Sequence, residues 1–270
     1  MDKHISSYEL ICMFYTKNGQ DCIIATLCTN FNQPIKQSYF FVTFAFQLKL
    51  KKRMQELVLI IISYLIGSIP TALLVSKRFF GIDIRDYGSG NMGATNTFRV
   101  LGSRYGTMVM VIDILKGLSA VMLYNFLPFY IGHELERTNL MLGLGTAAVV
   151  GHIFPIFAGF KGGKGVATLL GMVLAIQPVV AVSCIGIFIL VLYLTRYVSL
   201  SSILAALSLP ICVLWIWNEH EVLYRVFALI VAVLVVLTHQ KNIGRILRGV
   251  ESRIPILKHR DKRKSNQNHG

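Results

Sequence analysis

A short glycine- and lysine-rich segment, residues 159–165, carries the strongest chemical signal in the sequence. It reads Gly-Phe-Lys-Gly-Gly-Lys-Gly and is followed by an apolar stretch that begins at Val166. Glycines at the start of a helix present backbone N–H groups and the positive end of the helix dipole, and both favour phosphate binding. The alternative is a flexible loop whose lysines only set the membrane orientation. The candidate phosphate ligands are Lys161, Gly162, Gly163, Lys164 and Gly165.

The same segment does not have the spacing of a nucleotide-hydrolysing Walker A loop. Gly159 lies too close to the Gly163-Lys164 pair, and Gly165 stands where that motif needs a Ser or Thr to bind magnesium. The sequence also lacks the motifs of a serine hydrolase elbow, a zinc protease or a Cys-based metal site. We therefore expect no cofactor and no metal. A site rich in phosphate-binding groups and poor in nucleophiles indicates substrates that are already activated.

A second polar segment, residues 88–99, combines glycines with small hydroxyl and amide side chains. Glycines let successive backbone N–H groups form an anion-binding nest, and an arginine adds a planar fork suited to phosphate. A glycine-rich connector without a ligand is the equal alternative. The candidate substrate-binding residues here are Ser89, Asn91, Thr95, Asn96 and Arg99.

A third polar segment, residues 238–251, follows the last apolar stretch. His239 and Asn242 are three residues apart, so they share one face if the preceding helix continues. His239 could bind phosphate or move a proton, or it could simply be an interfacial histidine at a helix end. Arg245 adds a third candidate for phosphate binding.

Other polar residues lie inside or beside the apolar stretches. Asp113 and Lys116 are expected to pair and to face the bundle interior, and this is explained equally by a structural and by a functional role. His152 is expected to orient the 159–165 segment rather than to react. Cys184 and Cys212 are interpreted as small buried side chains. The serines that either cap a helix or contact a ligand are Ser199, Ser201 and Ser202.

The composition identifies the chain as an integral membrane protein. Of the 270 residues, 54% are hydrophobic and 15% are charged, against about 25% charged residues in soluble domains. The net charge is +14, but the basic residues gather at the ends of apolar stretches, as the positive-inside rule requires. The basic tail at 258–264 is expected to lie against anionic lipid. Nucleic acid is the weaker interpretation, because no aromatic residue interleaves with that run.

The pattern predicts an all-α, polytopic bundle of about seven transmembrane helices, with the three glycine-rich segments on the cytoplasmic face. The fourth span is weak and could be a re-entrant helix. Basic loops on one side and the acidic 218–221 loop on the other place the tail inside and Met54 outside. Polar loops at membrane depth are tolerated where protein buries them or water reaches them, so their convergence predicts a site. The expected spans are 56–75, 105–130, 139–157, 166–177, 178–194, 200–217 and 223–238.

Residues 1–53 do not share this pattern. Their only apolar run, 39–46, is too short to span a bilayer. The basic cluster at 49–53 opposes the predicted orientation, and its lysine and arginine codons can be purine-rich, as in a ribosome-binding site. We expect a non-native extension with the true start at Met54, a membrane domain at 54–253 and a basic cytoplasmic tail at 254–270. A genuine soluble extension is the alternative.

At the three polar segments the sequence resembles the bacterial acyl-phosphate:glycerol-3-phosphate acyltransferases, the PlsY family. Long motifs occur in the same order and at fitting distances over about residues 54–253. The matching stretches are Gly67-Ser68-Ile69-Pro70, Ser89 to Asn96 with Arg99, Gly151 to Pro155 leading into Phe160 to Thr168, and Thr238-His239 with Asn242-Ile243 and Arg245.

The resemblance implies an enzyme of bacterial phospholipid synthesis in the inner membrane. It would transfer a fatty acyl group from acyl phosphate to the sn-1 hydroxyl of glycerol 3-phosphate, giving lysophosphatidic acid and inorganic phosphate. The soluble acyl-phosphate synthase PlsX would supply the donor. The implied catalytic positions are Ser89, Arg99, Lys164, His239 and Asn242.

Two questions stay open at this point. The proton of the attacking hydroxyl could be accepted by the departing phosphate of the donor or by His239 acting as a general base. The competing function is a transporter or channel for a phosphorylated solute, although the inverted repeats that would favour it are not evident.

Overall fold

The computed structural model describes residues 12–15, 23–26, 34–127, 130, 132–216 and 221–253. The chain divides into two compact units, Met1–Val58 and Leu59–Gly270. In the first unit β1 (Cys12–Tyr15) pairs antiparallel with β2 (Ile23–Thr26). The helix α1 (Pro34–Gly67) includes the expected start at Met54, and that start remains a prediction. The basic tail at 254–270 and most of the acidic 218–221 loop lie outside the described residues.

The described part of the second unit is helical, as the sequence predicted. Short 3₁₀ turns connect several of the helices, and a π-helical turn (Cys212–Ile216) extends α8. The helices that follow α1 are α2 (Thr71–Phe80), α3 (Ala94–Leu101), α4 (Ser103–Met122), α5 (Glu134–Ile153), α6 (Val166–Ile176), α7 (Pro178–Thr195), α8 (Val198–Ile211), α9 (Val222–Thr238) and α10 (Gln240–Leu247). The 3₁₀ turns are η1 (Ile84–Asp86), η2 (Leu123–Phe126) and η4 (Ile156–Ala158).

The number of helices able to cross a bilayer is smaller than the seven predicted. Among the described residues, five segments are long and apolar enough, and a sixth results if α9 and α10 form one span bent by 57°. The expected fourth span is α6, which has only 11 residues. At 1.5 Å per residue it is about 16 Å long, roughly half the thickness of the hydrocarbon core. The hydropathy of α6 therefore reflects burial in the bundle rather than a complete crossing.

The expected first span is also interrupted. The helix α1 ends at Gly67 and α2 begins at Thr71. Pro70 lacks a backbone N–H and restricts the residue before it, so the helix cannot continue through this point. The break leaves the carbonyl of Ile69 available, and Lys116 Nζ donates a hydrogen bond to it.

Glycines bring α6 very close to α4. A methyl group added to Gly117 of α4 would come within 1.9 Å of the Thr168 carbonyl oxygen. A methyl group on Gly171 of α6 would come equally close to the carbonyl oxygen of Ile114. Small residues at a helix crossing let the two backbones approach, as is common in membrane bundles. This crossing fixes the N-terminal end of α6, which carries the glycine-rich 159–165 segment.

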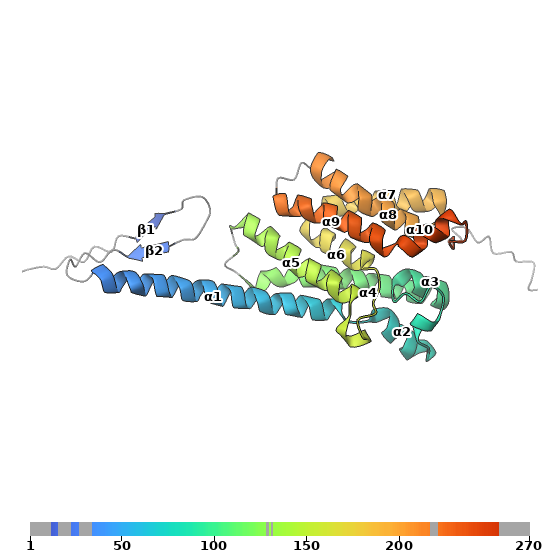
Figure 1. Cartoon of the computed structure of the whole chain (residues 1–270), viewed down its shortest axis with the longest axis horizontal. Helices are drawn as coiled ribbons and strands as arrows, with labels where there is room; N and C mark the ends of the chain where they lie inside the picture. Colours follow the sequence, from blue (N-terminus) through green and yellow to red (C-terminus); the bar gives the residue numbers. More distant parts are fainter. Residues whose placement is uncertain are drawn as a thin grey trace, which may run out of the picture. The chain divides into compact units, whose positions relative to one another are not determined.

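The main hydrophobic core contains buried residues from every helix between α4 and α9. In Figure 1, α7, α8 and α9 lie side by side, and α3 and α10 lie at the same end of the bundle. The three polar segments noted in the sequence belong to this end. The fold therefore brings together loops that are separated by about 60 and about 73 positions in the chain.

Candidate active site

A cavity of about 620 Å³ lies between the three polar segments and the helices beneath them. One part of its wall is polar and carries most of the residues selected from the sequence. The other part is apolar and is formed by α6, α7 and α8. The selected residues that line it are Ser89, Asn91, Thr95, Asn96, Arg99, Gly162, Lys164, Gly165, His239, Asn242 and Arg245. The apolar wall includes Leu169, Leu170, Val173, Ala181, Ile185, Phe188, Ala205, Ala206 and Leu209.

Asn242 connects the second and third polar segments. Its amide oxygen accepts a hydrogen bond from Lys164 Nζ, and its amide nitrogen donates to Glu251 Oε1 at 2.7 Å. Arg245 Nε donates to the other oxygen of Glu251 at 2.6 Å, and Ser199 Oγ donates to Oε1 at 2.9 Å. Glu251 thereby holds Asn242 and Arg245 at the rim of the cavity.

The surroundings lower the pKa of both Glu251 and Lys164. This favours the ionised form of Glu251 and the neutral form of Lys164. Burial works to raise the pKa of Glu251, but hydrogen bonds from Arg245, Asn242 and Ser199 together hold it below its usual value. Burial lowers the pKa of Lys164 to about 8, and the nearby charges of Arg245 and Arg99 add to this effect. A bound anion would relieve both of these penalties on the ammonium form.

The 159–165 segment approaches the cavity at the N-terminus of α6. Gly165 is the N-cap residue, with a φ of 77° that disfavours any side chain. The first amides of α6 have no partner within the helix, and Val166 and Ala167 line the cavity. Two backbone amides of this segment are bonded to the end of α5. Gly162 N donates to Ile153 O and Gly163 N donates to His152 O, each at 3.1 Å. Amides at a helix N-terminus with Lys164 beside them have the chemistry that suits a bound anion.

In the 88–99 segment one residue holds the loop and others face the cavity. Asn96 is buried, and its amide donates to the carbonyls of Ile84 and Tyr87 and accepts from Ser89 N at 2.8 Å. Its side chain is therefore engaged in shaping the loop, although it was selected as a substrate ligand. Ser89 is exposed and lines the cavity. Arg99 is also exposed, and its guanidinium donates to Ser252 Oγ.

His239 sits at the bend between α9 and α10, so the last helix does not continue straight as the prediction required. Its Nδ1 lies 2.8 Å from Val235 O. Because a carbonyl can only accept, Nδ1 carries the proton in the neutral ring and Nε2 is left with a lone pair. The imidazole can thus accept a hydrogen bond or a proton at Nε2.

Several selected residues have other positions or partners than the sequence suggested. Lys161 is exposed and is not part of the cavity wall, and Gly163 lies behind the wall. The N-cap of α8 is Tyr197, which makes no side-chain cap, so the serines after it do not cap that helix. Asp113 and Lys116 do pair, at 2.8 Å, and both are buried.

Sequence reasoning missed two parts of the site. Glu251 was noted in the third segment but not chosen, although a lone carboxylate among basic residues was a usable signal. The apolar wall could not be recognised, because its residues look like those of any membrane helix. Asp83, another carboxylate near the loops, is bound by Arg85, which holds the pKa of Asp83 at about 2.

Comparison with known proteins places the chain in a family. A family model for glycerol-3-phosphate acyltransferases matches residues 57–249. Glycerol-3-phosphate acyltransferases of Chlorobium chlorochromatii and Chlorobium limicola are 41% and 43% identical to this chain over 230 residues, covering 75% of this chain and 98% of each relative.

Two solved structures also match this chain. The crystal structure of PlsY (YgiH), an integral membrane glycerol 3-phosphate acyltransferase, matches in its glycerol 3-phosphate form with a TM-score of 0.65 and 38% identity, covering 74% of this chain and 95% of that one. Its lysophosphatidic acid form matches with a TM-score of 0.63. The chain belongs to the glycerol-3-phosphate acyltransferase family and is an integral membrane protein of the PlsY type.

Proposed function

We propose that this protein transfers a fatty acyl group from acyl phosphate to the sn-1 hydroxyl of glycerol 3-phosphate, releasing lysophosphatidic acid and inorganic phosphate. The observation that carries the proposal is a single cavity with a cationic, amide-rich end and an apolar end. A substrate pair with phosphate groups and one long acyl chain fits both ends. The matched structures of PlsY contain, by their descriptions, glycerol 3-phosphate and lysophosphatidic acid, one acceptor and one product of this reaction.

The polar end supplies the phosphate contacts. Lys164 and the first backbone amides of α6, next to Gly165, hold one phosphate. Gly162 lines the same part of the cavity, but its amide is bonded to Ile153 O. Ser89, Arg99, His239 and Asn242 hold the second phosphate or the glycerol hydroxyls, with Asn91, Thr95 and Arg245 at the rim of the same cavity. Asn96 and Gly163 act indirectly by shaping the two loops.

The apolar end receives the acyl chain. Ala205, Ala206 and Leu209 lie on one face of α8 and line the cavity with Phe188 of α7. Burying a methylene group contributes about 0.8 kcal/mol, so a chain placed along this wall would bind strongly. The carbonyl carbon would then lie near the polar end, where both phosphates are held.

The reaction needs no protein nucleophile. The sn-1 oxygen attacks the carbonyl carbon of the mixed anhydride, and the bond from that carbon to the phosphate oxygen breaks. The departing phosphate accepts the hydroxyl proton and leaves as inorganic phosphate. Positioning of two bound reactants can lower the barrier by about 7–11 kcal/mol, so a general base is not required.

His239→Gln tests the base-free route. A glutamine amide can accept a hydrogen bond near the place of Nε2 but cannot take a proton from the hydroxyl at neutral pH. We expect this variant to keep more than about a tenth of the turnover, since removal of a general base typically costs about 10²–10⁴-fold. Turnover should be measured from pH 6 to pH 9. A fall of more than about a hundredfold would contradict the base-free route.

The pH dependence should report the charge of Lys164. Its pKa is lowered to about 8, so the ammonium form is present below pH 8 and is lost as the pH rises. The second ionisation of a phosphate monoester, near pH 6, is complete before then. We expect kcat/KM to fall by about thirtyfold between pH 7 and pH 9.5, in proportion to the ammonium fraction. Lys164→Arg, which stays charged over this range, should show no such fall, and an equal fall in both proteins would refute the assignment.

We further propose that the polar loops face the cytoplasm of a bacterial inner membrane, with the soluble acyl-phosphate synthase PlsX as the supplier of the donor. The tail at 254–270 would lie at anionic lipid on the same side. Mass spectrometry of the native N-terminus tests the proposed start at Met54. We expect a first peptide that begins there, and a peptide from residues 1–50 would disprove the start.

The assay of purified protein with palmitoyl phosphate and radiolabelled glycerol 3-phosphate tests the reaction itself. Acyl-CoA serves as the control donor. We expect labelled lysophosphatidic acid from acyl phosphate only. Product from acyl-CoA alone would refute the proposed donor, and no product from folded protein with either donor would refute the proposed reaction.

A further inference from the structure

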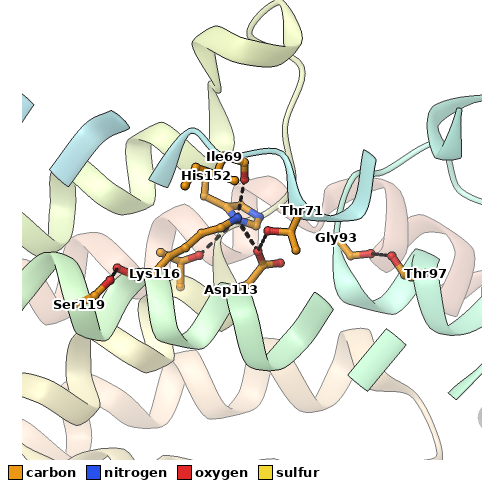
Figure 2. A network of polar contacts seen from close by, with 9 residues as sticks. Ile69, Thr71, Gly93, Thr97, Asp113, Lys116, Ser119 and His152 are labelled. Carbon is orange, nitrogen blue, oxygen red and sulfur yellow. Dashed lines mark hydrogen bonds and ion pairs between the residues drawn. The ribbon is translucent and has the colours of Figure 1, made fainter. Parts of the chain in front are cut away.

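A buried polar network lies beside the 159–165 segment, and the reaction above gives it no role. Two of its members, Asp113 and His152, also line the cavity. Lys116 Nζ donates to Asp113 Oδ1 at 2.8 Å and to Ile69 O at the break between α1 and α2. Thr71 Oγ1 donates to the same carboxylate oxygen at 3.0 Å. Figure 2 shows these groups converging on His152 of α5. The network therefore joins α2, α4 and α5 around one buried carboxylate.

The imidazole of His152 connects this network to the start of α6. Its Nδ1 lies 3.8 Å from Asp113 Oδ1 and 3.2 Å from Thr168 Oγ1 in the first turn of α6. On its other edge, a methyl group added to Gly163 would come within 2.2 Å of His152 Nε2. The ring thus fills the space between the carboxylate of α4 and the backbone of Gly163.

Two different interactions hold the loop at this place. The main-chain bonds from Gly162 and Gly163 to the carbonyls of Ile153 and His152 form whatever side chain stands at position 152. The ring instead limits how far Gly163 can move toward α4. Because Lys164 is the next residue, a shift of Gly163 moves the ammonium group relative to the amides of α6.

We propose that His152 is a positioning residue for the phosphate site, held in place by Asp113, Lys116 and Thr168, and that it fixes the position of Lys164 through contact with Gly163. The inference rests on the proposed function, because it takes the Lys164 loop as a substrate phosphate site. His152 does not touch the reacting atoms in this scheme. Its effect is on substrate affinity rather than on the chemical step.

A cycle of substitutions separates this role from simple core packing. Gly163→Ala places a methyl group against the ring of His152, and His152→Ala removes that ring. Gly162→Ala is the matched control, because its methyl group would meet the backbone oxygens of His152 and Ile153 at 2.1 and 2.5 Å, and these remain in any variant. Each single and double variant is titrated with glycerol 3-phosphate and with inorganic phosphate by calorimetry, and kcat and KM are measured. The ligand whose affinity falls in Lys164→Ala is the one bound by the 159–165 segment, and its affinity is compared across the variants.

We expect His152→Ala to weaken the affinity for that ligand by about tenfold while kcat stays within about threefold. Gly163→Ala should weaken it by tenfold or more in the native background but by less than about threefold in the His152→Ala background. Gly162→Ala should be equally harmful in both. Unchanged affinity in His152→Ala, or equal effects of Gly163→Ala in the two backgrounds, would overturn the proposal.

Thr168→Val provides the second test if His152→Ala does not yield folded protein. It keeps the shape of the side chain and removes the hydroxyl that lies beside Nδ1. Weaker phosphate affinity at unchanged kcat supports the proposal, and unchanged affinity overturns it. A native protein that binds glycerol 3-phosphate but forms no lysophosphatidic acid contradicts the proposed function alone, because the affinity cycle does not depend on turnover.

Discussion

Lys164→Ala should lower kcat/KM for acyl transfer by about 10²–10³-fold, the typical loss when one preorganised charge-stabilising group is removed from an active site. Lys164 is the cation that stands beside the N-terminus of α6, and Asn242 orients it by accepting a hydrogen bond from Nζ. Its side chain is half-buried, so water does not replace the lost charge well. Initial rates with palmitoyl phosphate and glycerol 3-phosphate measure the effect.

Lys161→Ala is the matched control for this prediction. Lys161 belongs to the same seven-residue segment and carries the same charge, but it is exposed and outside the cavity wall. Exposed charges contribute little at physiological salt, so we expect its kcat/KM to stay within about threefold of the native value. Equal losses in the two variants would show that only the net charge of the loop matters and would refute a specific role for Lys164.

Ala205→Phe should shorten the acyl chain that the proposed site accepts. Ala205 lines the apolar wall about 9 Å along α8 from Ser199, at 1.5 Å per residue. A phenyl group at this point would exclude the far end of a long chain. Displacing about four methylenes loses about 3 kcal/mol, which corresponds to about a hundredfold in affinity. We expect transfer from palmitoyl phosphate to fall by about that factor, while transfer from butyryl phosphate stays within about threefold.

Leu204→Phe controls for added bulk in α8. Leu204 is the preceding residue, is 38% exposed and does not line the cavity. Its substitution should leave both donors unaffected. A loss of activity with both donors in Ala205→Phe would indicate damage to the fold rather than a shortened site, and unchanged palmitoyl transfer would place the acyl chain elsewhere.

The membrane class and most helix positions could be predicted because they depend on local composition. Apolar stretches of the required length marked α4, α5, α7, α8 and α9. The bounds of α7 and α9 agree with the prediction to within one residue, whereas α4 ends eight residues earlier than predicted, at Met122, and α5 begins five residues earlier, at Glu134. The number of spans could not be predicted exactly, because hydropathy does not distinguish a helix buried among protein from one that crosses lipid. Among the described residues five or six segments are long and apolar enough to cross. The short helix α6 is apolar on account of its neighbours, with Gly117 and Gly171 at the crossing.

The candidate site was also predictable in part. Lys164, His239 and Asn242 were selected because their residue types and neighbouring glycines suit phosphate, and all three line one cavity. Lys161 was selected with Lys164 because two lysines three positions apart in a glycine-rich loop look alike until the turn is known, and the structure places Lys161 outside the cavity wall. Asn96 lines the cavity as selected, but its amide is bonded to the loop backbone. The sequence could not indicate this, since an amide can bind a ligand or nearby backbone with equal ease.

The sequence by itself determined that this protein lies in a membrane, that it handles phosphate and which loops carry the cations, because charge, glycine and hydropathy patterns are properties of neighbouring residues. Only the tertiary structure decided which residues share the cavity, that Glu251 holds Asn242 and Arg245, and that His152 stands behind Gly163. These are contacts between residues far apart in the chain, and their distances depend on how the helices pack. A pattern read along the chain contains no measure of that packing.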